Sequence, residues 1–490
     1  MTALKLVDVT MRDGNQSLWG ATGLNTAHML QAAALTEACG FRAVDFTSSS
    51  HMAVAVRYFQ NDPWERIRRM HAAMPTTPLQ FITTGLRFIA WQQADPEFMR
   101  LVYRQLQLNG IGRFVLLDPM HEVPAVVEAA RLVKAEGSAE VMCALTFTLS
   151  EFHTDEFYAN FARAVGQSRD IDLFYIKDPS GLMSVDRVRT LAPAVKAAIG
   201  NRPLEIHAHT TIGQGMLSSL EAAKLGVSAI HVGVGPGGDG SSLPEANRML
   251  ANLEEAGHTV DIDCDALAKL TSYWTRLAAA EGLPPGTPQN FDGSFLRHQI
   301  AGGVMTTTKR QLEELGLGDR LGAVIAETEQ VRAELGYPIM VTPFPQMVMS
   351  QALFNVIGTK RYAQVSDQVI RYVMGKFGKP TSPVDRHILG AIMDRPRARE
   401  LEDEPTFPAL SDLKRQFGAR MPDEEFLLRA VMPPEQVDAM LAAGRSRATY
   451  SPEAAPILAL LRRLAANPQA RDVVIERPGL RIALHAGAAA

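Results

Sequence analysis

Leu204-Glu205-Ile206-His207-Ala208-His209 is a short, largely apolar run that ends in two histidines. A run of this length and composition predicts a buried β-strand. Side chains two positions apart on a strand point to the same face, so His207 and His209 lie on one side of it. Both imidazoles can therefore reach a single metal ion.

Similar apolar runs recur through the first half of the chain and alternate with amphipathic segments such as Ala27–Cys39, Glu97–Leu108 and Met216–Lys224. The candidate strands are Lys5–Val9, Ala43–Thr47, Leu79–Thr84, Arg113–Asp118, Val141–Thr148, Leu173–Lys177, Leu204–His209 and Ala229–Gly233. Strands that alternate with helices predict a parallel sheet with helical crossovers. This number of strands fits the α/β class and a (β/α)8 TIM barrel. A doubly wound open sheet is the structural alternative.

Polar residues gather where these predicted strands end. Asp13 follows the first strand, Asp45 lies in the second, Asp118 closes the fourth, Lys177 the sixth and His209 the seventh. Enzymes built on a barrel place their active sites at the carboxyl ends of the strands. The distribution therefore predicts an active site at that end.

Beyond about residue 245 the pattern becomes helical. Helical spacing is found in Gln311–Leu315, Ala323–Leu335 and Val365–Phe377, and Asp472–Leu484 alternates around a Pro-Gly turn that is typical of a hairpin. We expect a barrel over residues 1–300, a helical domain that completes the active site over 301–465, and a short hairpin-like tail over 466–490.

Composition narrows the function classes. The chain has 490 residues, 46% of them hydrophobic, and a net charge of -4 with acids and bases interspersed. This balance argues against a nucleic-acid surface and a polybasic membrane anchor. The three cysteines lie far apart, and the N-terminus lacks a signal-peptide pattern. We expect a cytoplasmic protein that acts on a small molecule.

Asp13, His207 and His209 form a candidate metal site. One carboxylate and two imidazoles suit zinc, manganese or cobalt. The alternative is a hydrogen-bonded polar cluster at the mouth of the barrel.

Lys177 has three interpretations that its position leaves open. It can form an ion pair with Asp178 or Asp13, or act as a Schiff-base lysine, the usual role of a lysine at the end of the sixth strand in barrel aldolases. It can also react with CO2 to give a carbamate, an oxygen ligand for a metal.

Other candidate residues each have a structural alternative. Arg12 can bind a carboxylate or enolate oxygen, or pair with Asp45 or Asp118. Gln16 can polarise a substrate oxygen or cap a helix. The glycine-rich run 233–242 can bind phosphate or simply connect two elements. Thr306 can carry a proton or cap the helix that follows it.

A longer set of motifs carries a family resemblance. Asp8-Val9-Thr10-Met11-Arg12-Asp13-Gly14-Asn15-Gln16-Ser17-Leu18 resembles the D-T-T-x-R-D-A-H-Q-S-L signature of biotin-dependent carboxyltransferases. These include the transferase domain of pyruvate carboxylase, the α subunit of oxaloacetate decarboxylase and the metal subunit of transcarboxylase. The likeness spans roughly residues 4–440 and continues through Asp62-Pro63-Trp64-Glu65-Arg66, Ile176-Lys177-Asp178-x-x-Gly181-Leu182, His207-x-His209-x-Thr211-x-Gly213, Gly302-Gly303-x-x-Thr306 and Leu315-Gly316-Leu317-Gly318-Asp319-Arg320.

The resemblance implies a set of roles. The metal ligands would be Asp13, carbamylated Lys177, His207 and His209; Arg12 and Gln16 would bind substrate oxygens, and Thr306 would carry a proton between biotin and an enolate. Carboxybiotin would arrive on a separate carrier protein, loaded by a biotin carboxylase subunit. A homodimer or larger oligomer is expected.

The substrate-binding positions depart from the family pattern. Thr47-Ser48-Ser49-Ser50-His51-Met52-Ala53 stands where the family has W-G-G-A-T-F-D, and Thr84 stands where it has an arginine that grips a 2-oxo acid carboxylate. Arg87, three residues further on, is a possible replacement. We therefore expect an enolisable acceptor, a 2-oxo acid or a related carbonyl or acyl compound, other than pyruvate.

Two other functions compete with this hypothesis. One is a metal-dependent lyase or Claisen-type condensing enzyme that uses no biotin and is related to hydroxymethylglutaryl-CoA lyase. The other is a non-catalytic scaffold subunit of a carboxylase complex.

Overall fold

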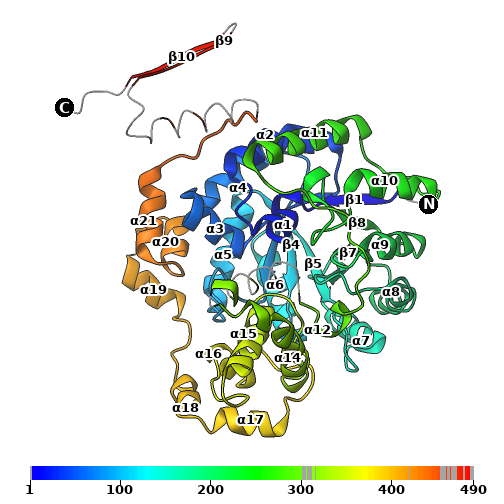
Figure 1. Cartoon of the computed structure of the whole chain (residues 1–490), viewed down its shortest axis with the longest axis vertical. Coiled ribbons are helices and arrows are strands. Elements are labelled where there is room, and N and C mark those ends of the chain that lie inside the picture. The colour runs from blue at the N-terminus through cyan, green and yellow to red at the C-terminus, as the bar shows by residue number, and fades with distance from the viewer. Residues whose placement is uncertain are drawn as a thin grey trace.

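Eight parallel strands close into a barrel in the order β1 to β8, with each strand paired to the next and β8 paired to β1 (Figure 1). The strands are β1 (Lys5–Asp8), β2 (Ala43–Ser48), β3 (Leu79–Thr84), β4 (Ile111–Leu117), β5 (Glu140–Thr146), β6 (Leu173–Asp178), β7 (Leu204–Ala208) and β8 (Ala229–Val232). The computed structural model describes residues 3–300, 305, 309, 312–314, 316–418, 420–452, 460, 464, 472–477 and 480–485. The prediction of a TIM barrel is confirmed, and the open-sheet alternative is wrong because β1 pairs with β8.

Helices surround the barrel and cover its apolar outer face. They are α1 (Asn15–Trp19), α2 (Thr26–Cys39), α3 (Ser49–Phe59), α4 (Pro63–Ala73), α5 (Pro96–Leu108), α6 (Val123–Ala135), α7 (Asp155–Val165), α8 (Val185–Ile199), α9 (Gly215–Lys224), α10 (Ala246–Glu255) and α11 (Cys264–Glu281). Asp62 and Asp95 cap α4 and α5, each followed by a proline at the first helical position. Such pairs begin a helix because the carboxylate accepts an otherwise unpaired amide N–H and proline needs none.

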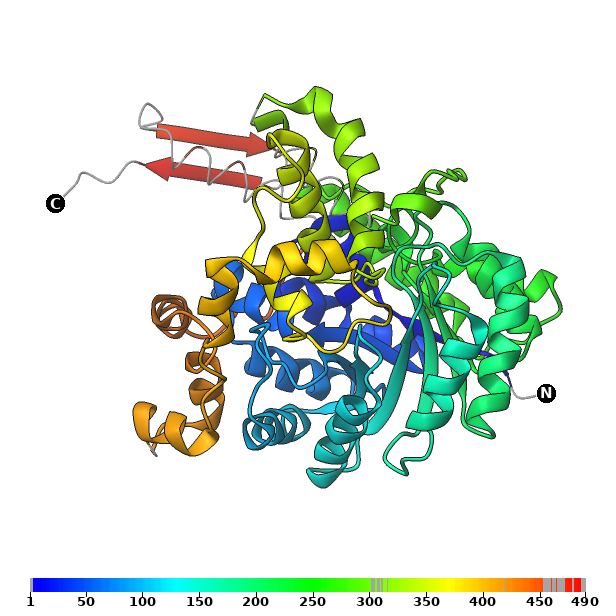
Figure 2. The same ribbon diagram turned by 90° about the horizontal axis from the view of Figure 1, so that it is seen from below.

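The chain after α11 is mainly helical. Its elements are α12 (Phe295–His298), α14 (Leu321–Glu334), α15 (Phe344–Ile357), α16 (Asp367–Val373), α17 (Arg386–Met393), α18 (Pro396–Glu402), α19 (Leu410–Phe417), α20 (Asp423–Arg429), α21 (Pro434–Ala443), and the antiparallel strands β9 (Asp472–Arg477) and β10 (Leu480–His485). Figure 2 shows this hairpin apart from the barrel strands. None of the helices in the described ranges has the length and apolar character that a bilayer crossing requires.

The helical region packs against the carboxyl ends of β3, β4 and β5. Val341 contacts an apolar cluster inside the barrel that includes Ile82 and Leu117. Arg332 on α14 donates hydrogen bonds to Thr148 Oγ1 and the Leu149 carbonyl, just beyond β5, at 2.9 and 3.0 Å. The end of the barrel that was expected to hold the active site is thus partly walled by this region.

The interior of the barrel contains charged side chains as well as apolar ones. Arg113 on β4 contacts Glu205 on β7 at 2.7 Å, and both side chains are buried. Because β4 and β7 are not neighbours in the sheet, this ion pair crosses the interior. Part of the barrel interior is therefore polar, and this polar part extends to the carboxyl ends of the strands.

Candidate metal centre

Asp13 lies on a short π-helical turn, Thr10–Gly14, directly after β1. Single π-turns are rare and often occur at functional sites. A side chain on Gly14 would place its Cβ 2.7 Å from the Gly237 carbonyl oxygen, so the turn requires glycine there. The hydroxyl of Ser17 donates to Asp13 Oδ1 at 3.0 Å, which helps to orient the carboxylate.

Lys177 and His207 are direct neighbours in the sheet, at the ends of β6 and β7. The Lys177 Nζ atom lies 2.9 Å from Asp13 Oδ2 and 2.7 Å from His207 Nε2. His209 Nε2 lies 3.2 Å from His207 Nε2 and 3.5 Å from Asp13 Oδ1. The structure thus brings all four predicted ligand residues together, and all four are buried.

The protonation of this cluster favours a cation among these residues. The Ser241 carbonyl lies 2.7 Å from His209 Nδ1 and can only accept, so Nδ1 carries the proton and Nε2 presents a lone pair. Burial and the neighbouring Lys177 lower the pKa of His207 well below its usual value, which keeps this imidazole neutral. Potential ligand atoms of Asp13, His207 and His209 all lie within 4.8 Å of one another. This donor set fits zinc, manganese or cobalt.

The charges around Asp13 keep it ionised. Burial alone would raise the pKa of Asp13, but Arg12 and Lys177 hold it well below its usual range. The pKa of Lys177 is lowered, because burial outweighs the opposing effect of Asp13. A lower pKa increases the fraction of neutral amine, which is the form that reacts with CO2.

Arg12 forms an ion pair with Asp45, which was the structural alternative to a substrate-binding role. Its Nε donates to Asp45 Oδ2 and one terminal nitrogen donates to Asp13 Oδ2, each at 2.8 Å. Asp118, the other candidate partner, instead accepts from the backbone amides of Met120 and Glu122. Arg12 therefore joins the end of β2 to the cluster of predicted ligands.

The predicted substrate residues are distributed more widely. Thr47 is buried in β2, whereas Gln16 on α1 and Thr84 at the end of β3 are half-buried. The Arg87 guanidinium donates to the carbonyls of Trp91 and Phe377, at 2.9 and 3.3 Å. Thr306 lies outside the described residues, so its role stays a prediction.

The glycine-rich run 233–242 positions His209. Its Ser241 carbonyl contacts His209 Nδ1, and the carbonyls of Gly240 and Ser242 accept from Thr210 Oγ1 at 3.0 and 3.1 Å. A Cβ on Gly238 would lie 2.7 Å from the Glu245 Cα, so the run is closely packed. Within the described contacts it is a buried support for β7 rather than a loose connection.

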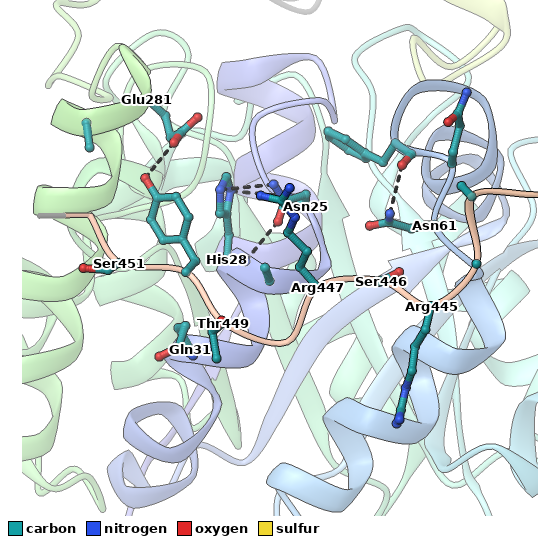
Figure 3. A pocket seen from close by; sticks show the side chains of 17 residues that line it. Asn25, His28, Gln31, Asn61, Glu281, Arg445, Ser446, Arg447, Thr449 and Ser451 are labelled. Carbon is teal, nitrogen blue, oxygen red and sulfur yellow. Dashed lines mark hydrogen bonds between the residues drawn. The ribbon is translucent and has the colours of Figure 1, made fainter. Parts of the chain in front are cut away.

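Two cavities lie outside the ligand cluster. One of about 920 Å³ lies between α2, α3, α11 and an extended segment at residues 443–451 (Figure 3). Tyr450 there donates to Glu281 at 2.6 Å, and Asn25 caps α2. Another, of about 420 Å³, is lined by Arg87, Asp118 and residues 373–380. Neither is lined by the four ligand residues.

Sequence reasoning missed three buried residues near the cluster: Arg113, Glu205 and His231. Glu205 precedes His207 by two positions and so shares its face of β7. That spacing was the available signal for Glu205. No spacing pattern pointed to Arg113 or His231, because each lies within an otherwise apolar strand.

A set of potential metal ligands at the carboxyl end of a closed barrel is typical of barrel enzymes. Residues 295–459 match the model of a conserved carboxylase domain. The chain is 29% identical over 392 residues to a pyruvate carboxylase subunit of Methanocaldococcus jannaschii, covering 80% of this chain and 68% of that one. It is 28% identical over 480 residues to the 2-oxoglutarate carboxylase large subunit of Hydrogenobacter thermophilus, covering 92% of this chain and 73% of that one.

The fold has a counterpart among solved structures. The carboxyl transferase domain of Rhizobium etli pyruvate carboxylase superposes with a TM-score of 0.83 at 20% identity, covering 99% of this chain and 84% of that one. The chain is thus similar to pyruvate and 2-oxoglutarate carboxylase subunits and to a methylmalonyl-CoA carboxyltransferase subunit. The resemblance seen in the sequence motifs is confirmed.

Proposed function

We propose that this enzyme moves a carboxyl group between carboxybiotin on a separate carrier protein and an enolisable acceptor, through a metal-stabilised enolate. The convergence of Asp13, Lys177, His207 and His209 at the carboxyl end of the barrel carries the proposal. The named relatives, carboxylase subunits and a methylmalonyl-CoA carboxyltransferase subunit, support the carboxyl-transfer part of it.

Asp13, His207, His209 and carboxylated Lys177 would hold a divalent cation. Such a cation supplies electrostatic stabilisation of the negative charge that develops on the acceptor oxygen. To become a ligand, the neutral Lys177 amine forms an N–C bond to CO2 and releases one proton, which leaves a carbamate oxygen. The lowered pKa of the buried lysine favours this step.

Arg12 adds a fixed positive charge beside the cluster. Because Asp45 and Asp13 already bind its guanidinium, its position is set before any acceptor arrives. A preorganised charge stabilises an enolate without reorganisation during the reaction. We assign the substrate oxygens to Arg12 and Gln16, and proton transfer between biotin and the enolate to Thr306.

The acceptor that we propose is not pyruvate. Thr84 carries no charge with which to bind a carboxylate, and two backbone carbonyls hold the guanidinium of Arg87. Thr47 and Thr84 instead offer hydroxyl groups, which suit a neutral carbonyl or acyl group. The proposed acceptor is therefore a carbonyl or acyl compound that lacks a free carboxylate at this position.

The division of the chain into 1–300, 301–465 and 466–490 also remains a proposal, as does a carrier protein that acts in trans with a biotin carboxylase subunit. Support for a shared active site comes from Arg332 and Val341, which bring the helical region onto the barrel.

A transfer assay tests the function. The purified chain, loaded with zinc, manganese or cobalt, is incubated with N-carboxybiotin labelled with ¹³C in the carboxyl group. The acceptors are pyruvate, 2-oxoglutarate and an acyl-CoA thioester, and products are detected by mass spectrometry. We expect one labelled product that requires metal, and its loss in Lys177→Ala. Lys224→Ala, at an exposed lysine paired with Glu221, is the matched control.

Other outcomes identify the competing functions. Turnover of pyruvate at a rate typical of enzymes, roughly 1 per second or more, would contradict the proposed acceptor class. Full metal content and activity in Lys177→Ala would favour a biotin-independent lyase or condensing enzyme. A wild-type chain without detectable metal or transfer would favour a scaffold.

A further inference from the structure

A chain of buried polar contacts leads from His207 into the barrel. His207 Nδ1 lies 3.0 Å from His231 Nδ1, and His231 Nε2 lies 3.0 Å from Glu205 Oε2. Arg113 then contacts the same Glu205 oxygen at 2.7 Å. All four side chains are buried, and they come from β4, β7 and β8. This chain of contacts is separate from the four proposed ligand atoms but ends on one ligand residue.

The contacts determine where the protons lie. Glu205, paired with Arg113, is a carboxylate that can only accept, so His231 Nε2 donates to it. Arg113 also contacts Glu140, at 3.1 Å, but Arg42 pairs with that second carboxylate. The two guanidinium groups therefore balance the two carboxylates, and His231 needs no second proton. Its Nδ1 then holds a lone pair, and the 3.0 Å contact requires His207 Nδ1 to be the donor. With its single proton on Nδ1, His207 presents the lone pair of Nε2 to the ligand cluster.

Tyr175 restricts the orientation of both rings. It stacks on His231 at 5.5 Å with an interplanar angle of 20° and meets His207 edge-on at 5.8 Å. The two imidazoles therefore cannot turn without displacing a buried aromatic ring. This packing makes the proton arrangement a property of the folded barrel rather than of a metal ion.

We propose that His231, held by Glu205 and Arg113, is a positioning residue that fixes the proton of His207 on Nδ1 and so prepares Nε2 to bind metal. This inference rests on the proposed metal centre. A carboxylate or carbonyl commonly orients a metal-binding histidine. Here an additional histidine lies between the carboxylate and the ligand, and nothing in the spacing of the motifs indicated it.

The alternative is that His231 only fills space. Two substitutions separate these roles. His231→Asn places a carbonyl oxygen close to the position of Nδ1 and preserves an acceptor for His207. His231→Leu has a similar volume but offers no acceptor. A packing role predicts that leucine is tolerated at least as well as asparagine, whereas a positioning role predicts the reverse.

The experiment measures metal affinity by competition with a chelator, together with the visible spectrum of the cobalt-loaded full chain. We expect His231→Leu to lose about 10–100-fold in metal affinity and to change the cobalt spectrum. Losses of this size are typical when a residue that orients a metal ligand is removed. His231→Asn should stay within about threefold of the wild type, well short of that loss. His28→Leu, at a buried histidine in the first turn of α2, controls for removal of an imidazole from the fold. Thermal unfolding of the metal-free proteins shows whether each variant folds.

The outcomes are distinct. A folded His231→Leu variant with wild-type affinity and spectrum overturns the inference, and so does equal weakening by leucine and asparagine. If His231→Leu does not fold, two single variants decide: His231→Asn and Glu205→Leu. Glu205→Leu removes the acceptor for His231 Nε2, so wild-type metal affinity in this variant overturns the inference. A wild-type chain that binds no metal overturns the metal centre itself, a failure that is distinguishable because it appears before any substitution.

Discussion

Arg12 contacts two carboxylates at once, and this arrangement makes Asp45 a structural partner of the site. Asp45 lies in β2, fully buried, and its second oxygen has no hydrogen-bond partner among the described residues. A buried charge with a single partner depends strongly on that partner. The pair therefore links the folding of β2 to the position of Asp13.

Asp45→Asn should destabilise the protein by roughly 3–5 kcal/mol, because it leaves Arg12 buried with only Asp13 as a charged partner. Urea unfolding followed by circular dichroism measures the change. Asp261→Asn, at an exposed carboxylate paired with Lys5, is the control and should stay within about 0.5 kcal/mol. A loss below about 1 kcal/mol in Asp45→Asn would show that the pair contributes little.

Asp8 makes stability depend on pH. Burial raises the pKa of Asp8 from 3.8 to about 6, against the opposing hydrogen bonds from Thr10. The folded state thus holds this proton more tightly than the unfolded state. Stability is greatest below pH 3.8 with respect to this group and is lost as the pH rises through about 6, by about 3 kcal/mol in total.

Asp8→Asn removes this dependence and keeps an acceptor for Thr10. Relative to the wild type, the variant should gain about 2.4 kcal/mol between pH 4 and pH 7.5, measured by urea unfolding at both values. Asp186→Asn, at an exposed carboxylate, should show no such gain. An equal stability difference at the two pH values would mean that Asp8 is not the group responsible.

At the scale of elements, the positions of the strands were predictable, but the polar side chains that the strands place inside the barrel were only partly predictable. Apolar runs indicated all eight strands, and the predicted ends differ from the observed ones by at most two residues. The fifth predicted strand continued to Thr148, but β5 ends at Thr146. The helix predicted over Val365–Phe377 is shorter, because Ser366 caps α16 and Gly375 adopts a positive φ soon after its end.

The polar interior could not be predicted in the same way. Arg113 and Glu205 meet across the barrel from strands that are not adjacent, and no local pattern encodes such a distance. That Asp13, Lys177, His207 and His209 lie together was predictable, because strand order brings all carboxyl ends to one face. The π-turn at Thr10–Gly14 was not predicted; it packs against the glycine-rich run, which is far away in the sequence.

The close packing of the glycine-rich run 233–242 predicts that a larger side chain there will weaken metal binding. Gly238→Ala places a Cβ against the backbone of Glu245 at 2.7 Å and should shift the run that holds His209. We expect a loss of roughly 1–3 kcal/mol in stability and a similar loss in metal-binding free energy. Gly322→Ala, on α14 with open space around it, should be neutral or slightly stabilising. Unchanged metal affinity in a folded Gly238→Ala protein would contradict the supporting role.

At the scale of the whole molecule, the barrel supplies the proposed metal ligands and the helical region covers part of the same end. Arg87 reaches the Phe377 carbonyl, Arg332 reaches Leu149, and Val341 packs against the apolar cluster that contains Ile82 and Leu117. The surroundings of the proposed acceptor site are therefore shared between two parts of the chain. The motifs assigned to the proposed catalytic centre are accordingly spread from Asp13 to Thr306.

The most direct test of a carboxyltransferase metal centre is ¹³C NMR of the full chain equilibrated with ¹³C-bicarbonate and metal. We expect one slowly exchanging carbamate signal that disappears in Lys177→Ala and on chelation of the metal, with a parallel loss of metal affinity in the variant. Lys224→Ala should keep both the signal and the affinity. Tight metal binding without a carbamate signal, unchanged in Lys177→Ala, would contradict the assignment of Lys177 as a ligand.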